Sequence, residues 1–403
     1  MRNTQALKEF ISKWRDAPLP SKEMLHEYKP FCRDLLFEEE ELVVETTGIL
    51  KRNIEAWAQK MSPVYLEKRE FVSKADLLDK DLWYVKSAMD EAQTMATSGS
   101  TTGSPFGYMR WEPFLYFIEG LNHYDLILDE FDVPKRPKIL YFFNSNQYDP
   151  KKLITVRDDS ANFMEHHGTS RKAEVHYVNF KAFEESHRDF FVNLIRHLLE
   201  DRIDVIFAPG PATNSMCHYM RKMNISDKIC GLLSNSNERI LQEDAAYLME
   251  GRADHVCDHM RCWDGGATFF TCRHKNYHLL DNLSWCEEVD GKLLSTDYFS
   301  IPSPFVRYWN GDMCSISNSY QRCECGRLYR EFEFLENRPF SMKGTCLQDI
   351  RCRIAKINSK CIKQVRCGLN TIDIISSEEI PEGQRGEISK LTDRFEFRFI
   401  VED

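Results

Sequence analysis

The stretch FVNLIRHLLEDRIDVIFAPGP, residues 191–211, contains a helical pattern followed directly by the pattern of a buried strand. Its first part repeats apolar residues at helical spacing, as one stripe facing a core, at Phe191, Leu194, Ile195, Leu198 and Leu199. Its second part is a continuous apolar run, Val205-Ile206-Phe207-Ala208, closed by Pro209-Gly210-Pro211. A helix that leads into a buried strand predicts an α/β fold.

The same alternation extends to both sides of this stretch. Buried-strand patterns precede it at residues 138–143 (KILYFF) and 174–178 (EVHYV), and another follows it at residues 229–233 (ICGLL). Residues 240–249 then show a helical pattern. Strands that alternate with helices predict βαβ units and mainly parallel sheets. In such sheets ligands bind at loops beyond the carboxyl ends of the strands.

The flanking regions differ in character. Residues 1–60 have helical patterns, residues 282–330 are rich in β-forming residues and turns, and a smaller α/β segment begins near residue 336. A chain of 403 residues exceeds one ordinary core. We therefore predict a large domain over residues 1–335, with mainly parallel sheets and a β-rich region, and a short α/β domain over residues 336–403.

Composition and charge argue against two classes of function. The formal net charge is −10, which does not suit a protein held mainly to nucleic-acid phosphates. No run approaches the ~18 apolar residues of a membrane span, and the stretch MRNTQALK at residues 1–8 has no apolar signal core. We therefore expect a cytoplasmic protein that binds neither nucleic acid nor membrane. In such a chain the 14 cysteines are expected to be reduced thiols or metal ligands.

Residues 97–107, TSGSTTGSPFG, form the segment best suited to binding an anion. Three glycines permit tight turns and close approach of main-chain N–H groups, and six hydroxyls add donors. We expect a strand to end at Met95-Ala96 and a mostly apolar helix to follow from Trp111. A flexible Ser/Gly linker is the alternative. The segment is not a kinase-type P-loop, because Lys-Ser/Thr does not follow the glycine.

This segment resembles the Ser/Thr/Gly-rich signature of the adenylate-forming (ANL) superfamily. Within it, the variant is similar to phenylacetate–coenzyme A ligases and the related capsule-polysaccharide biosynthesis proteins. Many relatives have Lys where Ser104 stands. The resemblance implies that the loop holds the β- and γ-phosphates of ATP, which leave as pyrophosphate, through Ser98, Gly99, Ser100, Thr101, Thr102 and Gly103.

Two further segments match the family in the same order. Residues 233–241, LSNSNERIL, resemble the Ser-Gly-Glu segment that borders adenine, which assigns Ser236 and Glu238 to the nucleotide site. An ordinary helix N-cap is the alternative. Residues 258–266, DHMRCWDGG, fall where the family has Tyr-Gly-x-Thr-Glu-Gly, so Asp264 is expected to hold Mg²⁺ against the phosphates. An Asp-Gly turn is the alternative there, and Met260, Arg261 and Trp263 depart from the pattern.

The segment PFVRYWNGD, residues 304–312, resembles the family's Pro-x-Ile-Arg-Tyr-x-Thr-Gly-Asp. The resemblance implies that Asp312 accepts hydrogen bonds from both ribose hydroxyls, a role that suits an acceptor-only carboxylate. Arg307 is expected either to face a phosphate or to orient a nearby carboxylate. Upstream, residues 71–77, FVSKADL, resemble the family's entry segment.

Two cysteine-containing segments predict a structural zinc site. Residues 323–327, CECGR, form a Cys-x-Cys-Gly knuckle, and residues 272–278, CRHKNYH, supply a further cysteine and two histidines. Relatives often carry cysteines at these points. We predict a Cys₃His set of Cys272, His278, Cys323 and Cys325, with His274 as the competing ligand. Buried free cysteines are the alternative.

The family's C-terminal lid usually brings a Lys, in a Gly-Lys context, to the α-phosphate and the acyl oxygen. The nearest counterpart here is Gly386-Glu387-Ile388-Ser389-Lys390, with Glu after the glycine, and a solvated surface lysine is the simpler interpretation of Lys390. Arg338 is expected to mark the hinge of the lid. Three alternatives stay open: catalysis without that lysine, a partner that completes the site, or nucleotide binding without reaction.

The resemblance implies an enzyme that converts ATP and a small carboxylic acid into an acyl-adenylate and pyrophosphate. Asp264 and Arg307 are its candidate catalytic residues, and ATP, Mg²⁺, structural Zn²⁺ and coenzyme A are its candidate cofactors. A second step would pass the acyl group to coenzyme A, a carrier protein or an amine. A catalytically impaired, nucleotide-binding regulatory or scaffold protein is the alternative. The sequence does not identify the acid, and because relatives are frequently dimers the resemblance allows a homodimer.

Overall fold

The structure is a computed structural model. It describes residues 4–17, 20–32, 34–66, 70–73, 76–77, 83–85, 88, 92–96, 107–111, 125–143, 153–158, 173–179, 187–236, 240, 242–261, 265–336, 362–367, 371–376, 378–390 and 396–401. Four of the predicted features therefore lie outside the described residues: the phosphate-loop residues Ser98–Gly103, Glu238, Asp264 and Arg338.

The described chain divides into two compact units. Described residues of 1–132 and 259–339 belong to the first unit, and those of 133–160, 172–258 and 340–403 belong to the second. Strand β9 (Ala253–Arg261) contributes to both, because the division falls between Asp258 and His259. The predicted domain boundary near residue 335 stays a prediction.

The second unit contains a mainly parallel sheet. Its strands lie in the order β8 (Cys230–Ser236), β7 (Ile203–Pro209), β4 (Lys138–Phe143), β6 (Glu174–Asn179) and β5 (Ile154–Asp158). The three inner pairings are parallel, and β5 pairs antiparallel with β6 at the edge. The mixed α/β fold with a parallel sheet, predicted from the alternating patterns, is confirmed.

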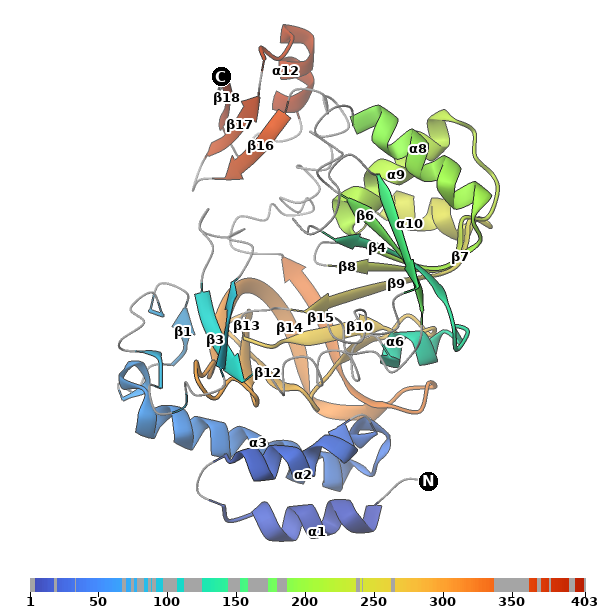
Figure 1. The fold of residues 1–403 in the computed structure, drawn as a ribbon. Coiled ribbons are helices and arrows are strands. Elements are labelled where there is room, and N and C mark those ends of the chain that lie inside the picture. The colour runs from blue at the N-terminus through green and yellow to red at the C-terminus, as the bar shows by residue number, and fades with distance from the viewer. Residues whose placement is uncertain are drawn as a thin grey trace. The chain divides into compact units, whose positions relative to one another are not determined.

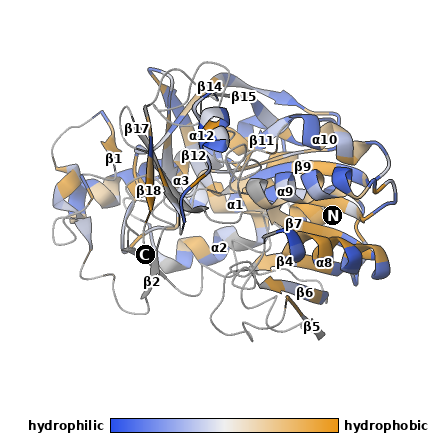
Figure 2. Cartoon of the chain, turned by 90° about the horizontal axis from the view of Figure 1, so that it is seen from above, coloured by the Kyte–Doolittle hydropathy of each residue, from blue (hydrophilic) through white to orange (hydrophobic). Residues whose placement is uncertain are grey.

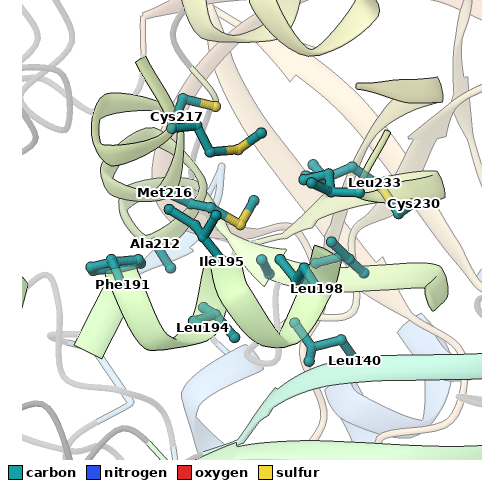
Figure 3. Close-up of a cluster of buried hydrophobic side chains, with 14 of the residues drawn as sticks. Leu140, Phe191, Leu194, Ile195, Leu198, Ala212, Met216, Cys217, Cys230 and Leu233 are labelled. Atoms are coloured by element: carbon teal, nitrogen blue, oxygen red, sulfur yellow. The ribbon is translucent and has the colours of Figure 1, made fainter. Parts of the chain in front are cut away.

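Three helices lie on one face of this sheet (Figure 1): α8 (His187–Glu200), α9 (Gly210–Lys222) and α10 (Gln242–Met249). Of the apolar stripe predicted for α8, Phe191, Leu194, Ile195 and Leu198 pack with Met216 and Cys217 of α9 and with Leu140 and Leu233 of the strands, as Figure 3 shows, whereas Leu199 is exposed. Strands β4 and β7 carry the colour of hydrophobic residues in Figure 2, while α8 has hydrophilic stretches as well. A helix that covers a sheet needs an apolar face toward the sheet and a polar face toward solvent.

The adjacent residues Leu198 and Leu199 test the packing of α8. Leu198 is 2% exposed in the core, whereas Leu199 is 38% exposed. We expect Leu198→Ala to lower the free energy of unfolding by about 2–5 kcal/mol, because it leaves a cavity. Leu199→Ala should change it by less than about 0.5 kcal/mol. Urea unfolding of both variants provides the measurement, and equal losses would contradict the described packing.

The first unit begins with three helices, as predicted for residues 1–60: α1 (Thr4–Trp14), α2 (Lys22–Cys32) and α3 (Glu40–Met61). Short 3₁₀ turns, η1 (Leu35–Phe37) and η2 (Pro63–Tyr65), lie on either side of α3. Two donors from these helices anchor them to loops of the β-rich region. Tyr28 donates its hydroxyl to the carbonyl of Asn282 at 2.7 Å, and the Trp57 indole donates to the carbonyl of Ile301 at 3.0 Å.

The β-rich region of the first unit matches the prediction for residues 282–330. Its main sheet has the order β1 (Val72–Ser73), β14 (Tyr308–Arg322), β13 (Lys292–Asp297) and β12 (Ser284–Val289), and β15 (Leu328–Glu336) also pairs with β14. Strands β10 (Thr268–Thr271) and β11 (Tyr277–Leu279) form a hairpin, and α6 (Asp125–Glu130) is the last helix of this unit among the described residues. No helix in the described part of the chain is both long and apolar enough to cross a bilayer.

One local expectation is wrong. The predicted strand ending at Ala96 is present as β2 (Ala92–Ala96), but Trp111, where we expect a helix to begin, is the last residue of a second strand, β3 (Gly107–Trp111). The residues that would continue that helix lie outside the described residues. The two strands pair antiparallel, with Ala96 opposite Gly107. Tyr108 is fully buried, and its neighbours Met109 and Trp111 also suit a strand. The Ser/Thr/Gly segment therefore joins the ends of a hairpin.

Described elements of the C-terminal segment form a small sheet of β16 (Ile362–Cys367), β17 (Thr371–Ser376) and β18 (Glu396–Val401), with helix α12 (Glu382–Ser389). Strands β17 and β18 are parallel, and β16 is antiparallel to β17. The alternating apolar and polar residues of the segment EFRFIV form β18. Gly386 and Glu387 lie inside α12, and Lys390 is the residue that caps it.

Candidate functional site

A bulge in strand β14 sets Asp312 apart from the regular ladder. Ser295 and Leu294 of β13 pair with Tyr308 and Trp309, but the next pairing joins Lys292 to Met313. Leu293 alone therefore faces three residues of β14, namely Asn310, Gly311 and Asp312. Gly311 has φ 102°, a conformation that a side chain would disfavour. Bulges of this kind re-aim side chains next to active sites.

Arg307, directly before β14, has a conformation unusual for a residue with a side chain. Its φ is 48°, in the left-handed region. Its N–H donates to Thr296 Oγ1 at 3.0 Å, and its Nε donates to Glu287 Oε1 at 2.8 Å. Lys51 Nζ also lies 3.7 Å from Glu287 Oε2. Arg307 thus contacts a carboxylate, and its role in a site stays a prediction.

The glycine that follows Asp264 lies against the same strand. Gly265 has φ 89°, and a Cβ there would lie 2.6 Å from Ser295 Oγ and 2.7 Å from the Tyr308 ring. Gly266 has φ 77°, and a Cβ would meet the Asp297 carboxylate at 2.7 Å. Both positions therefore require glycine. Asp264 itself is outside the described residues, but its neighbour Gly265 touches Tyr308, four residues before Asp312.

A small buried cluster joins the described parts of these segments. It contains Val64, Val72, Leu77, Trp83, Tyr108, Phe305 and Tyr308. The Phe305 ring lies 5.1 Å from Trp83, 5.5 Å from Tyr108 and 4.9 Å from Tyr308, each in an edge-on arrangement. Such edge-on contacts are worth about 0.5–1.5 kcal/mol each beyond the area they bury. Strand β3 after the phosphate-loop segment and the start of β14 thus share one core.

Hydrogen bonds to the carbonyl of Pro304 fix the orientation of this aromatic cluster. The Trp83 indole donates to it at 2.8 Å, and the Tyr65 hydroxyl donates to it at 2.7 Å. The Tyr65 oxygen in turn accepts the N–H of Val306 at 3.2 Å. Burial raises the pKa of Tyr65, so this hydroxyl keeps its proton and can donate. The entry segment joins the same site, because Val72 pairs with Tyr308 in parallel.

The four predicted zinc ligands come together in the first unit. Their ligand atoms, from Cys272, His278, Cys323 and Cys325, all lie within 4.8 Å of one another. Cys272 Sγ is 3.7 Å from Cys323 Sγ, and Cys325 Sγ is 3.5 Å from His278 Nε2. A tetrahedral zinc ion would separate two thiolates by ~3.8 Å and a thiolate from an imidazole nitrogen by ~3.5 Å. The spacing therefore fits a zinc ion.

Two hairpin turns of the same design present these ligands. Cys272 donates its N–H to the carbonyl of Asn276 at 3.0 Å and accepts from the N–H of Lys275 at 2.9 Å. In the other turn Cys323 donates to Arg327 at 2.9 Å and accepts from Gly326 at 2.8 Å. Lys275 and Gly326 have φ 65° and 89°. Three-residue hairpin loops with a left-handed third residue show this pattern.

The competing histidine lies elsewhere. His274 Nδ1 is 3.2 Å from Glu324 Oε2, and both side chains are partly or largely exposed. His278, by contrast, is fully buried and stacks on Phe270 with ring centroids 5.6 Å apart. The pKa of Cys325 is held well below its usual range by its hydrogen bond with Cys272 and by His278. The same hydrogen bond raises the pKa of Cys272, and burial raises the pKa of Cys286 to about 12 and also that of Cys314.

Sequence reasoning missed two carboxylates that fix this region. Glu287 holds Arg307, and Glu130 of α6 holds both hairpin turns. Glu130 is 6% exposed, accepts the N–H of Arg273 at 3.1 Å and pairs with the buried side chain of Arg327. Glu130 and Arg327 are separated by 197 positions in the sequence, so no local pattern could have identified the pair.

The contact between Gly265 and Tyr308 can be tested against a glycine of the same conformation. Gly251 has φ 94° with no atom within 4 Å of an added Cβ. We expect Gly251→Ala to cost only the left-handed strain, about 1–2 kcal/mol. Gly265→Ala should cost a further ~1–3 kcal/mol, since its methyl group would overlap Ser295 and Tyr308. Equal unfolding free energies of the two variants would show that Gly265 is not packed against β14.

Several solved structures have a similar fold. A 2-hydroxyisobutyryl-CoA ligase in the postadenylation state, in complex with R3-HIB-AMP, has a TM-score of 0.58 and 12% identity over 92% of this chain and 88% of that chain. An open conformation of that ligase with 2-HIB-AMP and CoA has a TM-score of 0.57 and 14% identity, over 89% and 91% of the two chains. Its thioesterification state has a TM-score of 0.56 and 13% identity, over 95% and 90%.

No protein-family model and no curated protein sequence matches the chain. At identities of 12–14% the structural likeness concerns the fold, and the narrower branch suggested by the motifs stays a prediction. The segments that resemble adenylate-forming enzymes lie, where they are described, at turns, bulges and strand ends of that fold. The chain has the fold of these ligase structures, and the mixed α/β fold that its sequence predicts is present in it.

Proposed function

We propose that the protein activates a carboxylic acid with ATP. A carboxylate oxygen of the acid attacks the α-phosphorus, the acyl-adenylate forms, and pyrophosphate leaves with the electrons of the broken P–O bond. The acyl group is then transferred to a thiol, of coenzyme A or a carrier protein, or to an amine, and AMP leaves. The solved 2-hydroxyisobutyryl-CoA ligase with a similar fold is bound to an acyl-AMP and to CoA, which supports this reaction class.

The bulge of β14 is the observation that carries the proposal. It takes Asp312 out of the regular pairing between β13 and β14, and Asp312 is the residue that the family pattern assigns to the ribose. A carboxylate accepts hydrogen bonds from two hydroxyls at once, which suits a 2′,3′-diol. The aromatic cluster also fixes β3, so the phosphate-loop hairpin and the bulge share one support.

The remaining roles in the proposal follow the sequence. Residues 98–103 hold the β- and γ-phosphates between the paired ends of β2 and β3. Asp264 would hold Mg²⁺, which would neutralise phosphate charge, and it directly precedes Gly265 at Tyr308. Ser236, the last residue of β8, and Glu238 border the adenine. The small sheet of β16–β18 with α12 serves as the lid.

Pyrophosphate exchange into ATP, driven by a panel of aryl, fatty and amino acids, tests the reaction. We expect acid-dependent exchange, and a loss of about 10- to 100-fold in Asp312→Asn, because hydrogen bonds to a charged group contribute about 1.5–3 kcal/mol each. Asp290→Asn is the matched control, since its side chain is 79% exposed in the turn before β13 and its φ of 51° suits Asn.

Two results would contradict the proposal. If the exchange rate of Asp312→Asn equals that of the wild type, Asp312 is not part of the site. ATP binding without exchange for any acid would instead favour the regulatory or scaffold function, or a partner that completes the site.

We also propose that Cys272, His278, Cys323 and Cys325 bind one structural Zn²⁺ ion. The ion would join the β10–β11 turn to the β14–β15 turn, which Glu130 also links. The Nδ2 of Asn276 donates to Cys323 Sγ at 3.3 Å, as outer partners of metal thiolates commonly do. Because the four side chains fill a closed tetrahedral set, the site would have no open position for catalysis.

The zinc content of purified protein checks this site. We expect one zinc ion per chain in the wild type, loss of it in His278→Gln and Cys325→Ser, and full retention in the matched variant His274→Gln. Chelation should lower the thermal melting temperature of the wild type, because metal binding to the folded state stabilises it. Zinc that stays in His278→Gln, or is absent from wild type grown with zinc, would argue for free thiols.

A further inference from the structure

A second cluster of metal-binding side chains lies in the other unit. His176 of β6, His197 in the last turn of α8, and Asp201, which follows α8, place one ligand atom each within 4.8 Å of one another. His176 Nδ1 and His197 Nε2 are 2.8 Å apart. Neither the motifs of the sequence nor the proposed reaction uses these residues. His176 is the third residue of β6 and pairs with Leu140 of β4, so the cluster lies toward the amino ends of these parallel strands, away from the loops that follow them.

The tautomer of His176 points a lone pair at this cluster. His176 is fully buried, and its Nε2 lies 2.8 Å from Glu174 Oε1. An ionised carboxylate is acceptor-only, so Nε2 must carry the hydrogen and donate it. Nδ1 then keeps its lone pair on the side of His197. A carboxylate that accepts from one nitrogen of a histidine while the other nitrogen faces a ligand position is the arrangement of metal-bound histidines.

Charges around the cluster also favour a cation. Asp201 and Glu174 supply two carboxylates, against the single ammonium of Lys138, which is 2.7 Å from Asp201 Oδ1 and 3.4 Å from Glu174 Oε1. Asp201 has a second oxygen, so it can ligate an ion and keep Lys138. The carbonyl end of α8 adds the partial negative charge of a helix C-terminus.

We infer that His176 Nδ1, His197 Nε2 and one oxygen of Asp201 form a binding site for a divalent transition-metal ion. Two nitrogens 2.8 Å apart, each ~2.05 Å from an ion, subtend roughly 90° at it. That angle belongs to octahedral or square coordination, and imidazole with carboxylate oxygen suits Ni²⁺, Co²⁺ or Cu²⁺. Water completes the coordination, because Asp201 and His197 are only partly buried. The site is chemically distinct from the Cys₃His set.

The test uses the whole protein with its cysteine site first filled by one equivalent of Zn²⁺. Calorimetric titration with Ni²⁺ should then show one further saturable site per chain. We expect His197→Gln to abolish it and Asp201→Asn to weaken it, and Glu174→Gln to weaken it by about 10- to 100-fold as the loss of an outer partner does. His218→Gln, which removes a histidine of α9 that is not in the cluster, should bind as the wild type does.

Further measurements distinguish a metal-binding site from two histidines that are only hydrogen-bonded to each other. Circular dichroism establishes that each variant is folded, and Asp201→Asn changes a partly exposed side chain, so it tests the site even if His197→Gln unfolds. Co²⁺ bound here should give the weak spectrum of a six-coordinate ion without thiolate charge-transfer bands. No saturable Ni²⁺ site in the zinc-filled wild type would overturn the inference. So would undiminished binding by both His197→Gln and Asp201→Asn.

Discussion

The packing of Phe305 against Trp83, Tyr108 and Tyr308 is the interaction on which the candidate site depends. These four rings come from segments that are up to 225 residues apart in the sequence, Trp83 and Tyr308 being the most distant. Because the Pro304 carbonyl accepts from both Trp83 and Tyr65, the rings cannot slide without losing buried hydrogen bonds. The hairpin ends at Ala96 and Gly107, the Gly265 turn and the β14 bulge are therefore positioned together.

The two units use different means to hold their functional side chains. The second unit has a large apolar core between α8, α9 and its parallel sheet, and the His176–His197–Asp201 cluster lies toward the amino ends of strands β4 and β6. The β-rich region of the first unit has a smaller core around Phe269, Leu293 and Cys314. There the paired turns, the Glu130 carboxylate and the four proposed zinc ligands add cross-links that apolar burial alone would not supply.

Periodicity and spacing predicted much of this molecule because those signals are local. The parallel strands, helix α8 and the last strand β18 follow from apolar patterns, and the cysteine cluster follows from two short motifs. Features that depend on distant partners were not predictable. Leu293 facing three residues of β14, Glu287 on Arg307 and Glu130 on Arg327 each arise from tertiary pairing. The strand position of Trp111 belongs with these, because strand β3 packs through Tyr108 against the distant Phe305.

The binding of nucleotide analogues that lack a ribose hydroxyl tests the central claim that the β14 bulge positions Asp312 to bind the ribose. Dissociation constants are measured for ATP and 2′-deoxy-ATP on the wild type and on Asp312→Asn, as a double-mutant cycle. The account predicts that removing the hydroxyl weakens binding by about tenfold or more in the wild type and has little further effect in Asp312→Asn. Equal losses in both proteins would show that Asp312 and the ribose hydroxyl do not interact, and would contradict the account.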